Sequence, residues 1–485
     1  GRNAISQGSG DATGGVHLEV PPNGEASFHS WLAAGRSYKE VKGRNARILA
    51  KGAPRMMSRT ESYWKLWAKK EPIDTSLLPD AVRDLFYRSQ LIIRTQIDNA
   101  GAIIAANDSD IQQFAGDHYS YCWPRDGALV AYSLILLGQS ELPRNFFRYC
   151  AEVIEDDGYF LHKYTPNGQL ASSWHPWMID GQRILPIQQD ETALVAWSLR
   201  RHFEAFRDVE FVKPLYNPLI VRPAEWILKY RDSNGLPQPS WDLWEERRGI
   251  HTFTVATTIG ALNAAADFAR DFGELDREAA FREGAVSMRS AMKKHLWNGE
   301  QERFARMATP LSGGGYRLDM TADSANYAIF AFGAMEPSDP RVRSEMAHLR
   351  ERLSVRTAVG GCARYERDYY HQIERERTEI VPGNPWIICT LWQAQYLIAA
   401  ATTLDELKEA MDLINWATFR TAPSGVLAEQ FHPYTGDPIS VSPLTWSHAT
   451  FVIAVMEYLR KHEQLVKQIS NRRTAASAPE AHSGV

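Results

Sequence analysis

Two acidic segments of the chain place carboxylates beside aromatic residues, at the ends of apolar stretches with helical spacing. The first contains Trp244, Glu245 and Glu246, and the second contains Glu429 and Phe431. Cleaving the acetal of a glycosidic bond needs one carboxylic acid to protonate the leaving oxygen and a second, ionised carboxylate as base or nucleophile. Aromatic rings offer flat apolar surfaces for sugars and exclude water. Either segment alone is more typical of a solvated helix start than of a catalytic site.

Further loops carry the same combination of aromatic, acidic and arginine residues. In chain order they are residues 119–127 (YSYCWPRDG), 188–191 (QQDE), 240–246 (SWDLWEE), 363–366 (ARYE) with 383–386 (GNPW), and 427–431 (LAEQF) with 444–447 (LTWS). Together these five regions resemble glycoside hydrolase family 15, the glucoamylase family, across roughly residues 78–462. Each motif is short enough to arise by chance, but five in the same order make the resemblance specific.

The resemblance implies an (α/α)6 barrel and an inverting exo-hydrolase that releases β-glucose from the non-reducing ends of α-1,4-glucans and maltooligosaccharides. Glu245 stands at the family's general acid and Glu429 at its general base. In an inverting enzyme the two carboxyl groups are expected about 6.5–9.5 Å apart, with room for a water beside the base. The acid needs a raised pKa to stay protonated, and Glu246 and the surroundings of Trp244 are expected to supply it through like-charge repulsion and desolvation.

The resemblance also implies which residues bind the sugar. Arg125 and Asp126 match the pair that hydrogen-bonds the outer hydroxyls of the terminal glucose, and Tyr119 matches the ring that stacks near the reacting carbon. The expected binding residues are Tyr119, Trp123, Arg125, Asp126, Asp190, Trp244, Glu246, Arg364 and Trp446. Trp241 is expected to frame the pocket, and neither a metal nor an organic cofactor is expected. Core packing of the aromatic residues and a buried structural Arg125–Asp126 pair stay open as alternatives.

The chain departs from the family's better-known fungal members just before Gln188. Those members carry an aromatic residue and an arginine there, whereas this chain has residues 184–187 (ILPI). Trp174 and Trp177 are expected to supply the missing wall. The charged loop at residues 365–377 is expected to be solvated, and a cover over the pocket or an interface stays open as the alternative. Glucodextranase or trehalase activity, and a catalytically silent glucan-binding regulatory module, remain alternatives; the presence of both carboxylates argues against the silent module.

Helices must hold these loops in place. From about residue 79 to residue 462, apolar stretches with helical spacing recur between short loops, and strand-like alternation is scarce. The first helix begins at Pro79, and later ones are expected near residues 127–137, 143–155, 189–205, 216–231, 253–272, 275–296, 322–334, 340–353, 385–402, 405–417 and 444–461. Some are apolar nearly all round and others are charged on one side, which predicts inner helices wrapped by outer ones. Residues 76–465 are therefore expected to form an all-α, double-layered α/α barrel.

The two ends of the chain have a different composition. Residues 1–75 are expected to be a remnant of an N-terminal β-domain plus a linker, because residues 17–20 (HLEV) alternate like a strand and residues 21–24 (PPNG) resemble a turn. Residues 466–485 are expected to be a disordered tail, rich in Ala, Ser, Arg and Pro towards the end. Because the chain begins Gly-Arg-Asn, its natural N-terminus and any signal peptide are expected to be missing.

Composition excludes several classes of function. The 485 residues contain 54 Lys plus Arg against 58 Asp plus Glu, a formal net charge of -4, so neither nucleic acid nor another polyanion is an expected partner. No uninterrupted apolar stretch approaches about 18 residues, so no membrane association is expected. The four widely spaced cysteines are expected to be buried free thiols, which mildly favours a cytoplasmic location. The expected partner is an oligo- or polysaccharide, and the sequence leaves localisation and oligomeric state open.

Overall fold

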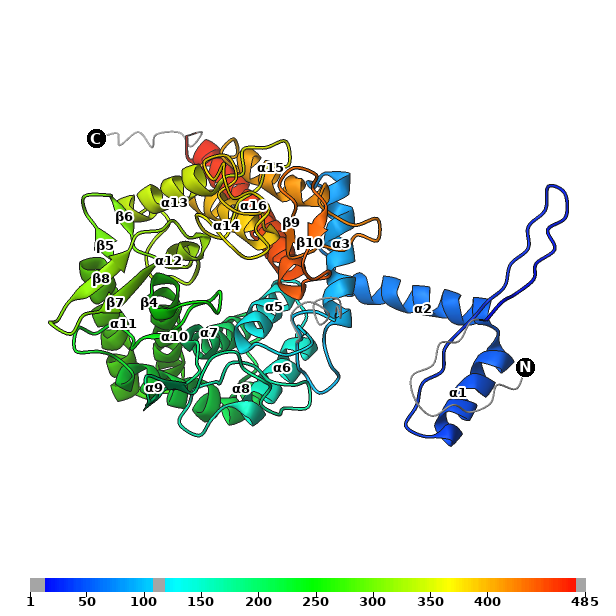
Figure 1. Ribbon diagram of the computed structural model, residues 1–485, viewed down its shortest axis with the longest axis horizontal. Coiled ribbons are helices and arrows are strands. Elements are labelled where there is room, and N and C mark those ends of the chain that lie inside the picture. Colours follow the sequence, from blue (N-terminus) through cyan, green and yellow to red (C-terminus); the bar gives the residue numbers. More distant parts are fainter. Residues whose placement is uncertain (1–13, 108–117, 477–485) are drawn as a thin grey trace, which may run out of the picture. The chain divides into compact units, whose positions relative to one another are not determined.

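The structure is a computed structural model that describes residues 14–107 and 118–476, and it divides into two compact units, Gly1–Lys70 and Glu71–Val485 (Figure 1). The first unit contains helices α1 (Tyr38–Lys51) and α2 (Ala53–Ala68). Ser37 caps α1 by accepting a hydrogen bond from the Glu40 N–H. Residues 14–37 contain no strand, so the strand expected at residues 17–20 is not formed. Four alternating residues without a partner strand cannot build a hydrogen-bonded ladder.

The second unit is an (α/α)6 barrel whose inner helices form a closed ring. The inner positions are taken by α5 (Pro124–Leu136), α7 (Gln189–Phe206), α10 (Thr252–Asp271), the 3-10 turn η2 (Ser324–Tyr327) with α12 (Ala328–Ala331), α14 (Ile387–Ala400) and α16 (Thr445–Ala476). Each position contacts the next, and α16 contacts α5 in return, which closes the ring. The alternation of helix types read from the sequence is confirmed by this arrangement.

The outer layer alternates with the inner one along the chain. Its members in chain order are α3 (Asp80–Thr95), α6 (Glu141–Val153), α8 (Val209–Tyr216) with the π-turn η1 (Asn217–Val221) and α9 (Arg222–Lys229), α11 (Leu275–His295), α13 (Pro340–Leu353) and α15 (Leu407–Thr418). Helix α3 lies beside α15 and α16, where the ring closes. The single helix expected at residues 216–231 is in fact this α8–η1–α9 run. Pro214, Pro218 and Pro223 each remove a backbone donor there, which interrupts regular helical hydrogen bonding.

The last inner helix is longer than expected. It continues to Ala476, so the prediction of a disordered tail is wrong for residues 466–476, and residues 477–485 lie outside the described part of the chain. Leu465 is buried, and Val466 and Ile469 keep apolar residues at helical spacing beyond the expected end. Local helical spacing therefore outweighs the polar composition of this segment.

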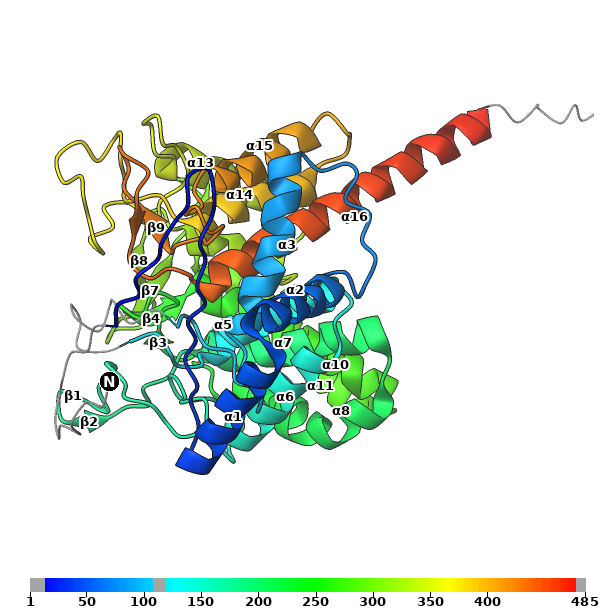
Figure 2. The same ribbon diagram turned by 90° about the vertical axis from the view of Figure 1, so that its right-hand side faces the viewer.

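Short antiparallel strands lie in the loops between helices. One sheet has the order β3 (Ser240–Trp241), β4 (Arg248–His251), β7 (Met307–Pro310) and β8 (Tyr316–Asp319). Three hairpins join β1 (Met178–Ile179) to β2 (Gln182–Arg183), β5 (Trp297–Asn298) to β6 (Arg303–Phe304), and β9 (Gln430–Phe431) to β10 (Pro438–Ile439). Figure 2 shows β3, β4, β7, β8 and β9 gathered at one end of the barrel helices. The acidic segments around Glu245 and Glu429 adjoin these strands, so they belong to the same end.

The remaining sequence expectations concern cysteines and membrane spans. All four cysteines are free and buried, as expected. None of the helices in residues 14–107 and 118–476 combines the length and apolar character that crossing a bilayer requires.

Candidate active site

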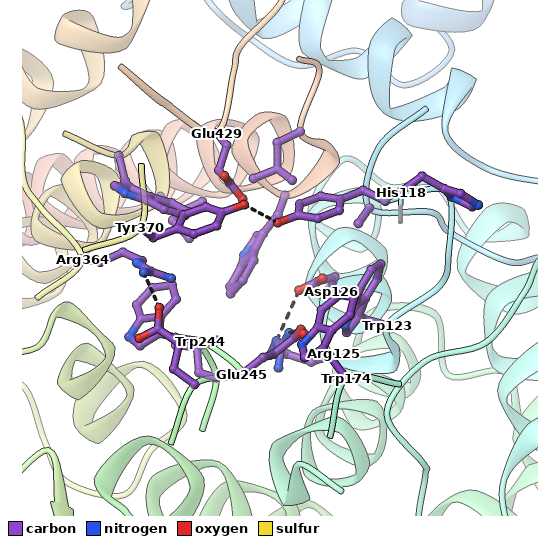
Figure 3. Close-up of a pocket in the computed structure, with 18 of the residues that line it drawn as sticks. His118, Trp123, Arg125, Asp126, Trp174, Trp244, Glu245, Arg364, Tyr370 and Glu429 are labelled. Carbon is purple, nitrogen blue, oxygen red and sulfur yellow. Dashed lines mark hydrogen bonds and ion pairs between the residues drawn. The ribbon is translucent and has the colours of Figure 1, made fainter. Parts of the chain in front are cut away.

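A cavity of about 340 Å³ opens among the loops at the strand-bearing end of the barrel (Figure 3). Four of the five motif regions contribute to its wall; residues 188–191 do not. The lining residues are Ala105, His118, Tyr119, Trp123, Arg125, Asp126, Trp174, Leu243, Trp244, Glu245, Glu246, Arg364, Tyr369, Tyr370, Trp386, Ile388, Glu429, Leu444 and Trp446. Aromatic rings and charged side chains therefore share one small open cavity.

Every predicted catalytic or binding residue except Asp190 lines this cavity. Asp190 is fully buried and lies behind Arg125. The expected position of Trp241 is wrong, because its ring stacks on His175 with centroids 4.4 Å apart instead of facing the cavity. Trp174 lines the cavity as expected, whereas Trp177 does not.

Several lining residues were not predicted from the sequence. The loop at residues 365–377 contributes Tyr369 and Tyr370 to the wall, so the alternative that it covers the pocket applies to these residues, not the preferred solvated position. The hydroxyl of Tyr370 lies 3.0 Å from that of Tyr119, so the two rings bridge the cavity rim from distant parts of the chain. The two adjacent tyrosines, close to the ARYE motif, were the available sequence signal for this contribution.

The β3–β4 hairpin holds Glu245 in an unusual backbone conformation. Its φ is +64°, a left-handed conformation that costs a non-glycine residue about 1–3 kcal/mol. Its N–H donates to the carbonyl of Asp242 at 2.9 Å, and the Asp242 carboxylate accepts the N–H groups of Glu246 at 2.7 Å and Arg247 at 2.9 Å. The side chain of Asp242 therefore organises the loop that carries both adjacent glutamates.

Replacing Asp242 by alanine should lower the free energy of unfolding by about 1–3 kcal/mol, because two partly buried N–H groups lose a charged acceptor. Urea denaturation followed by tryptophan fluorescence measures this loss. The matched control is Asp242→Asn, which keeps the carbonyl oxygen and should lose less. An alanine variant as stable as the wild type would contradict the role given to Asp242.

Glu245 makes two polar contacts with cationic or basic side chains. Its Oε2 lies 2.8 Å from Nε2 of His162, and its Oε1 lies 3.7 Å from Nη2 of Arg125. Burial alone raises the pKa of Glu245, but a protonated His162 and Arg125 together outweigh burial and lower that pKa to about 2. The expectation that the pKa of Glu245 is raised is therefore wrong when His162 carries the proton.

The neighbouring Glu246 does not repel Glu245 as expected, because its charge is neutralised. One oxygen of Glu246 lies 2.7 Å from Nη2 of Arg364, and the other lies 2.6 Å from Nη1 of Arg247. The guanidinium of Arg364 also binds both oxygens of Asp368, at 2.8 and 2.7 Å. This network fixes Glu246 and Arg364 as a charged pair on the cavity wall.

Glu429 lies across the cavity from Glu245 (Figure 3). Its backbone N–H donates to the carbonyl of Val441 at 3.0 Å, next to the β9–β10 hairpin. The residue is only 5% exposed, and this burial raises the pKa of its carboxyl to about 7. The side chain of Glu429 therefore ionises as the pH rises through about 7. Above that pH it is a carboxylate that can accept a proton.

Arg125 is the centre of a buried ion network at the cavity floor. Its guanidinium lies 3.3 Å from Asp126, 3.1 Å from Asp190 and 5.7 Å from the ring centroid of Trp446. Burial raises the pKa of Asp126 to about 6 in spite of Arg125. The structural ion pair left open above is thus present, and Arg125 and Asp126 also line the cavity, so the two interpretations are compatible.

One group of potential metal ligands occurs in the described residues. Ligand-type atoms of His162, His175 and Glu245 lie within 4.8 Å of one another. The two imidazole rings stack at 4.2 Å and 26°, and Nε2 of His175 lies 3.2 Å from Nε2 of Gln188. Because the rings lie face to face and hydrogen-bond to other side chains, we interpret the group as a stacked histidine pair in which His162 supports Glu245 by a hydrogen bond.

Comparisons with known proteins give a consistent family. The sequence profile of Glycosyl hydrolases family 15 matches residues 81–422 and 399–456. An uncharacterized glycosyl hydrolase of Methanocaldococcus jannaschii is 27% identical over 380 residues, covering 76% of this chain and 55% of that protein. A glucoamylase of a Clostridium species is 24% identical over 473 residues, covering 92% and 62%. The chain therefore spans less than two thirds of the length of either relative.

Solved structures match the barrel. A bacterial glucoamylase complexed with acarbose superposes with a TM-score of 0.69 and 21% identity, over 88% of this chain and 62% of that one. A glucoamylase from Saccharomycopsis fibuligera gives 0.62 and 17%, over 79% and 95%. These likenesses confirm the predicted (α/α)6 fold. Since the family profile covers well over half of the sequence, the chain belongs to glycoside hydrolase family 15.

Proposed function

We propose that the protein is an inverting, exo-acting α-glucoside hydrolase that releases β-glucose from the non-reducing ends of α-1,4-glucans and maltooligosaccharides. The observation that supports this most is the position of Glu245 and Glu429, which face one cavity from opposite sides although they belong to loops far apart in the sequence (Figure 3). Membership of the family and the glucoamylases among the relatives support the same substrate class.

In this mechanism Glu245 gives a proton to the glycosidic oxygen as the bond from that oxygen to C1 breaks. Glu429 takes a proton from the water that attacks C1 on the opposite face, so the configuration inverts. The ring of Tyr119, which lies beside the cavity, offers a π face to the positive charge that develops at C1. The protons balance, because Glu245 ends as a carboxylate and Glu429 ends protonated.

The two charged pairs on the wall suit different sugars. Arg125 and Asp126 present donors and an acceptor to the hydroxyls of the terminal glucose, and Glu246 and Arg364 do the same for the sugar that leaves. The rings of Trp244 and Trp446 supply apolar faces beside them.

The test follows glucose release from maltotriose, isomaltotriose and trehalose by ¹H NMR during the first minutes. We expect maltotriose to be the best substrate and β-glucose to appear before mutarotation. Initial α-glucose would overturn inversion, and faster hydrolysis of isomaltotriose or trehalose would assign a glucodextranase or trehalase instead. Binding of acarbose without turnover of any of the three sugars would identify a silent glucan-binding module.

A further inference from the structure

His162 contacts Glu245 but does not reach the cavity. The side chain is fully buried and does not line the cavity wall. Its Nε2 lies 2.8 Å from Oε2 of Glu245, and its Nδ1 lies 2.8 Å from Oγ of Ser173. Both ring nitrogens are thus engaged, so His162 can act on a bound sugar only through the carboxyl group of Glu245.

The contact between Nε2 and Oε2 has hydrogen-bond length, so one proton lies between the two atoms. The indole N–H of Trp123 also points to Nε2, at 3.3 Å, and an indole nitrogen can only donate. With Trp123 donating, Nε2 is an acceptor, Nδ1–H donates to Ser173, and Glu245 holds the shared proton as a carboxylic acid. Moving that proton along the bond gives the imidazolium and the carboxylate. His162 and Glu245 therefore hold one proton in common.

Other charged and titratable groups face this pair from the surrounding loops: Tyr119, Arg125, Asp126, Lys163 and His175. Arg125 shares its charge with Asp126, 3.3 Å away, and the Lys163 ammonium lies 3.5 Å from the ring centroid of Trp174.

His175 stacks on His162 at 4.2 Å, but burial lowers the pKa of His175 to about 3, so His175 is neutral near pH 7. Burial keeps the phenol of Tyr119 protonated, since its pKa is raised well above the usual value. Of the groups that face Glu245 in the described part of the chain, His162 is the one whose proton can pass to Glu245 directly.

We propose that His162 is a positioning residue that shares the catalytic proton with Glu245 and keeps the acid supplied with it at a pH where a lone carboxyl is ionised. This proposal rests on the function proposed above. When two coupled groups share a proton, the apparent pKa for its loss belongs to the pair. An imidazole ordinarily titrates near 6.5, about two units above a glutamate carboxyl near 4.3.

The proton leaves the pair for the glycosidic oxygen as the bond to C1 breaks, and Glu245 becomes a carboxylate. The hydroxyl of Ser173 can accept or donate, so it satisfies Nδ1 of His162 in either tautomer. After the transfer His162 is neutral with its proton on Nδ1, and Glu245 is a carboxylate. A proton taken up from solvent at Nε2 or Oε2 then restores the hydrogen bond between the two side chains.

The test compares the pH dependence of kcat/KM on maltotriose for the wild type and His162→Gln. Glutamine keeps an N–H for Glu245 but carries no titratable proton. The alkaline limb is the part of the profile where kcat/KM falls as the pH rises. In His162→Gln we expect this limb to lie about one pH unit lower, so that the loss of kcat/KM relative to the wild type is about tenfold larger at pH 8 than at pH 5. A uniform loss with an unmoved limb would indicate a merely structural role and overturn the proposal. The matched control is His175→Gln, equally buried but not bonded to Glu245, whose limb should stay in place.

A second measurement does not depend on variant activity. In wild-type protein with ¹⁵N-labelled histidine, the His162 signal should change over the same pH interval as the alkaline limb. In Glu245→Gln it should change at lower pH, because the negative partner is gone; an unchanged interval would overturn the proposal. If the wild type hydrolyses none of the three sugars, the proposed function fails while this titration still tests the shared proton.

Discussion

Exchanging Glu245 for glutamine is expected to lower kcat on maltotriose about 10²–10⁴-fold, because general acid catalysis contributes that much and an amide cannot supply the proton. Glutamine has the shape of glutamate and keeps a hydrogen bond to His162, so the left-handed backbone at this position and the thermal stability should change little. Steady-state kinetics with maltotriose, together with a thermal unfolding curve, measures both effects.

The leaving group provides the control for this variant. Fluoride departs from α-glucosyl fluoride without needing a proton, so Glu245→Gln should keep far more activity on this substrate than on maltotriose. Equal losses on both substrates would show that Glu245 does something other than protonate the leaving oxygen, for example holding the sugar in place.

The helical framework could be predicted well because burial leaves a strong periodic signal. α13 was expected at residues 340–353 and occupies those residues, since its apolar positions face inward and Asp339 caps its first turn. Errors arose where local signals compete. Prolines divide the expected helix at residues 216–231, and the polar composition after Leu465 hides a helix that continues to Ala476.

The wall of the site could be predicted from motifs, but its electrostatics could not. Motif matching finds which residues meet, because chain order and spacing carry the family resemblance. The pKa of Glu245 depends on His162, which lies 83 residues away in the sequence and has no motif of its own. Trp241 was misplaced for a related reason: neighbouring residues of a strand point to opposite faces, and its face meets His175.

Exchanging Glu429 for glutamine is expected to lower kcat by a similar factor, about 10²–10⁴, on maltotriose and on α-glucosyl fluoride alike. Activating the water is required whatever group leaves, so this variant should not distinguish the two substrates as Glu245→Gln does. Kinetics on both substrates measure the pattern. If Glu429→Gln kept its activity on α-glucosyl fluoride alone, Glu429 would be the acid and Glu245 the base.

The pH profile gives this prediction a second, independent readout. Burial raises the pKa of Glu429 to about 7, and only the ionised form can take a proton from water. The wild-type kcat/KM should therefore rise as the pH increases through about 7 and be lost below it. In Glu429→Gln the residual activity should show no acid limb in this range, since the group that titrates is gone. If the loss of activity below about pH 7 persists in Glu429→Gln, another carboxyl group of the cavity causes it. Asp126 is then the nearest match, because burial raises its pKa to about 6.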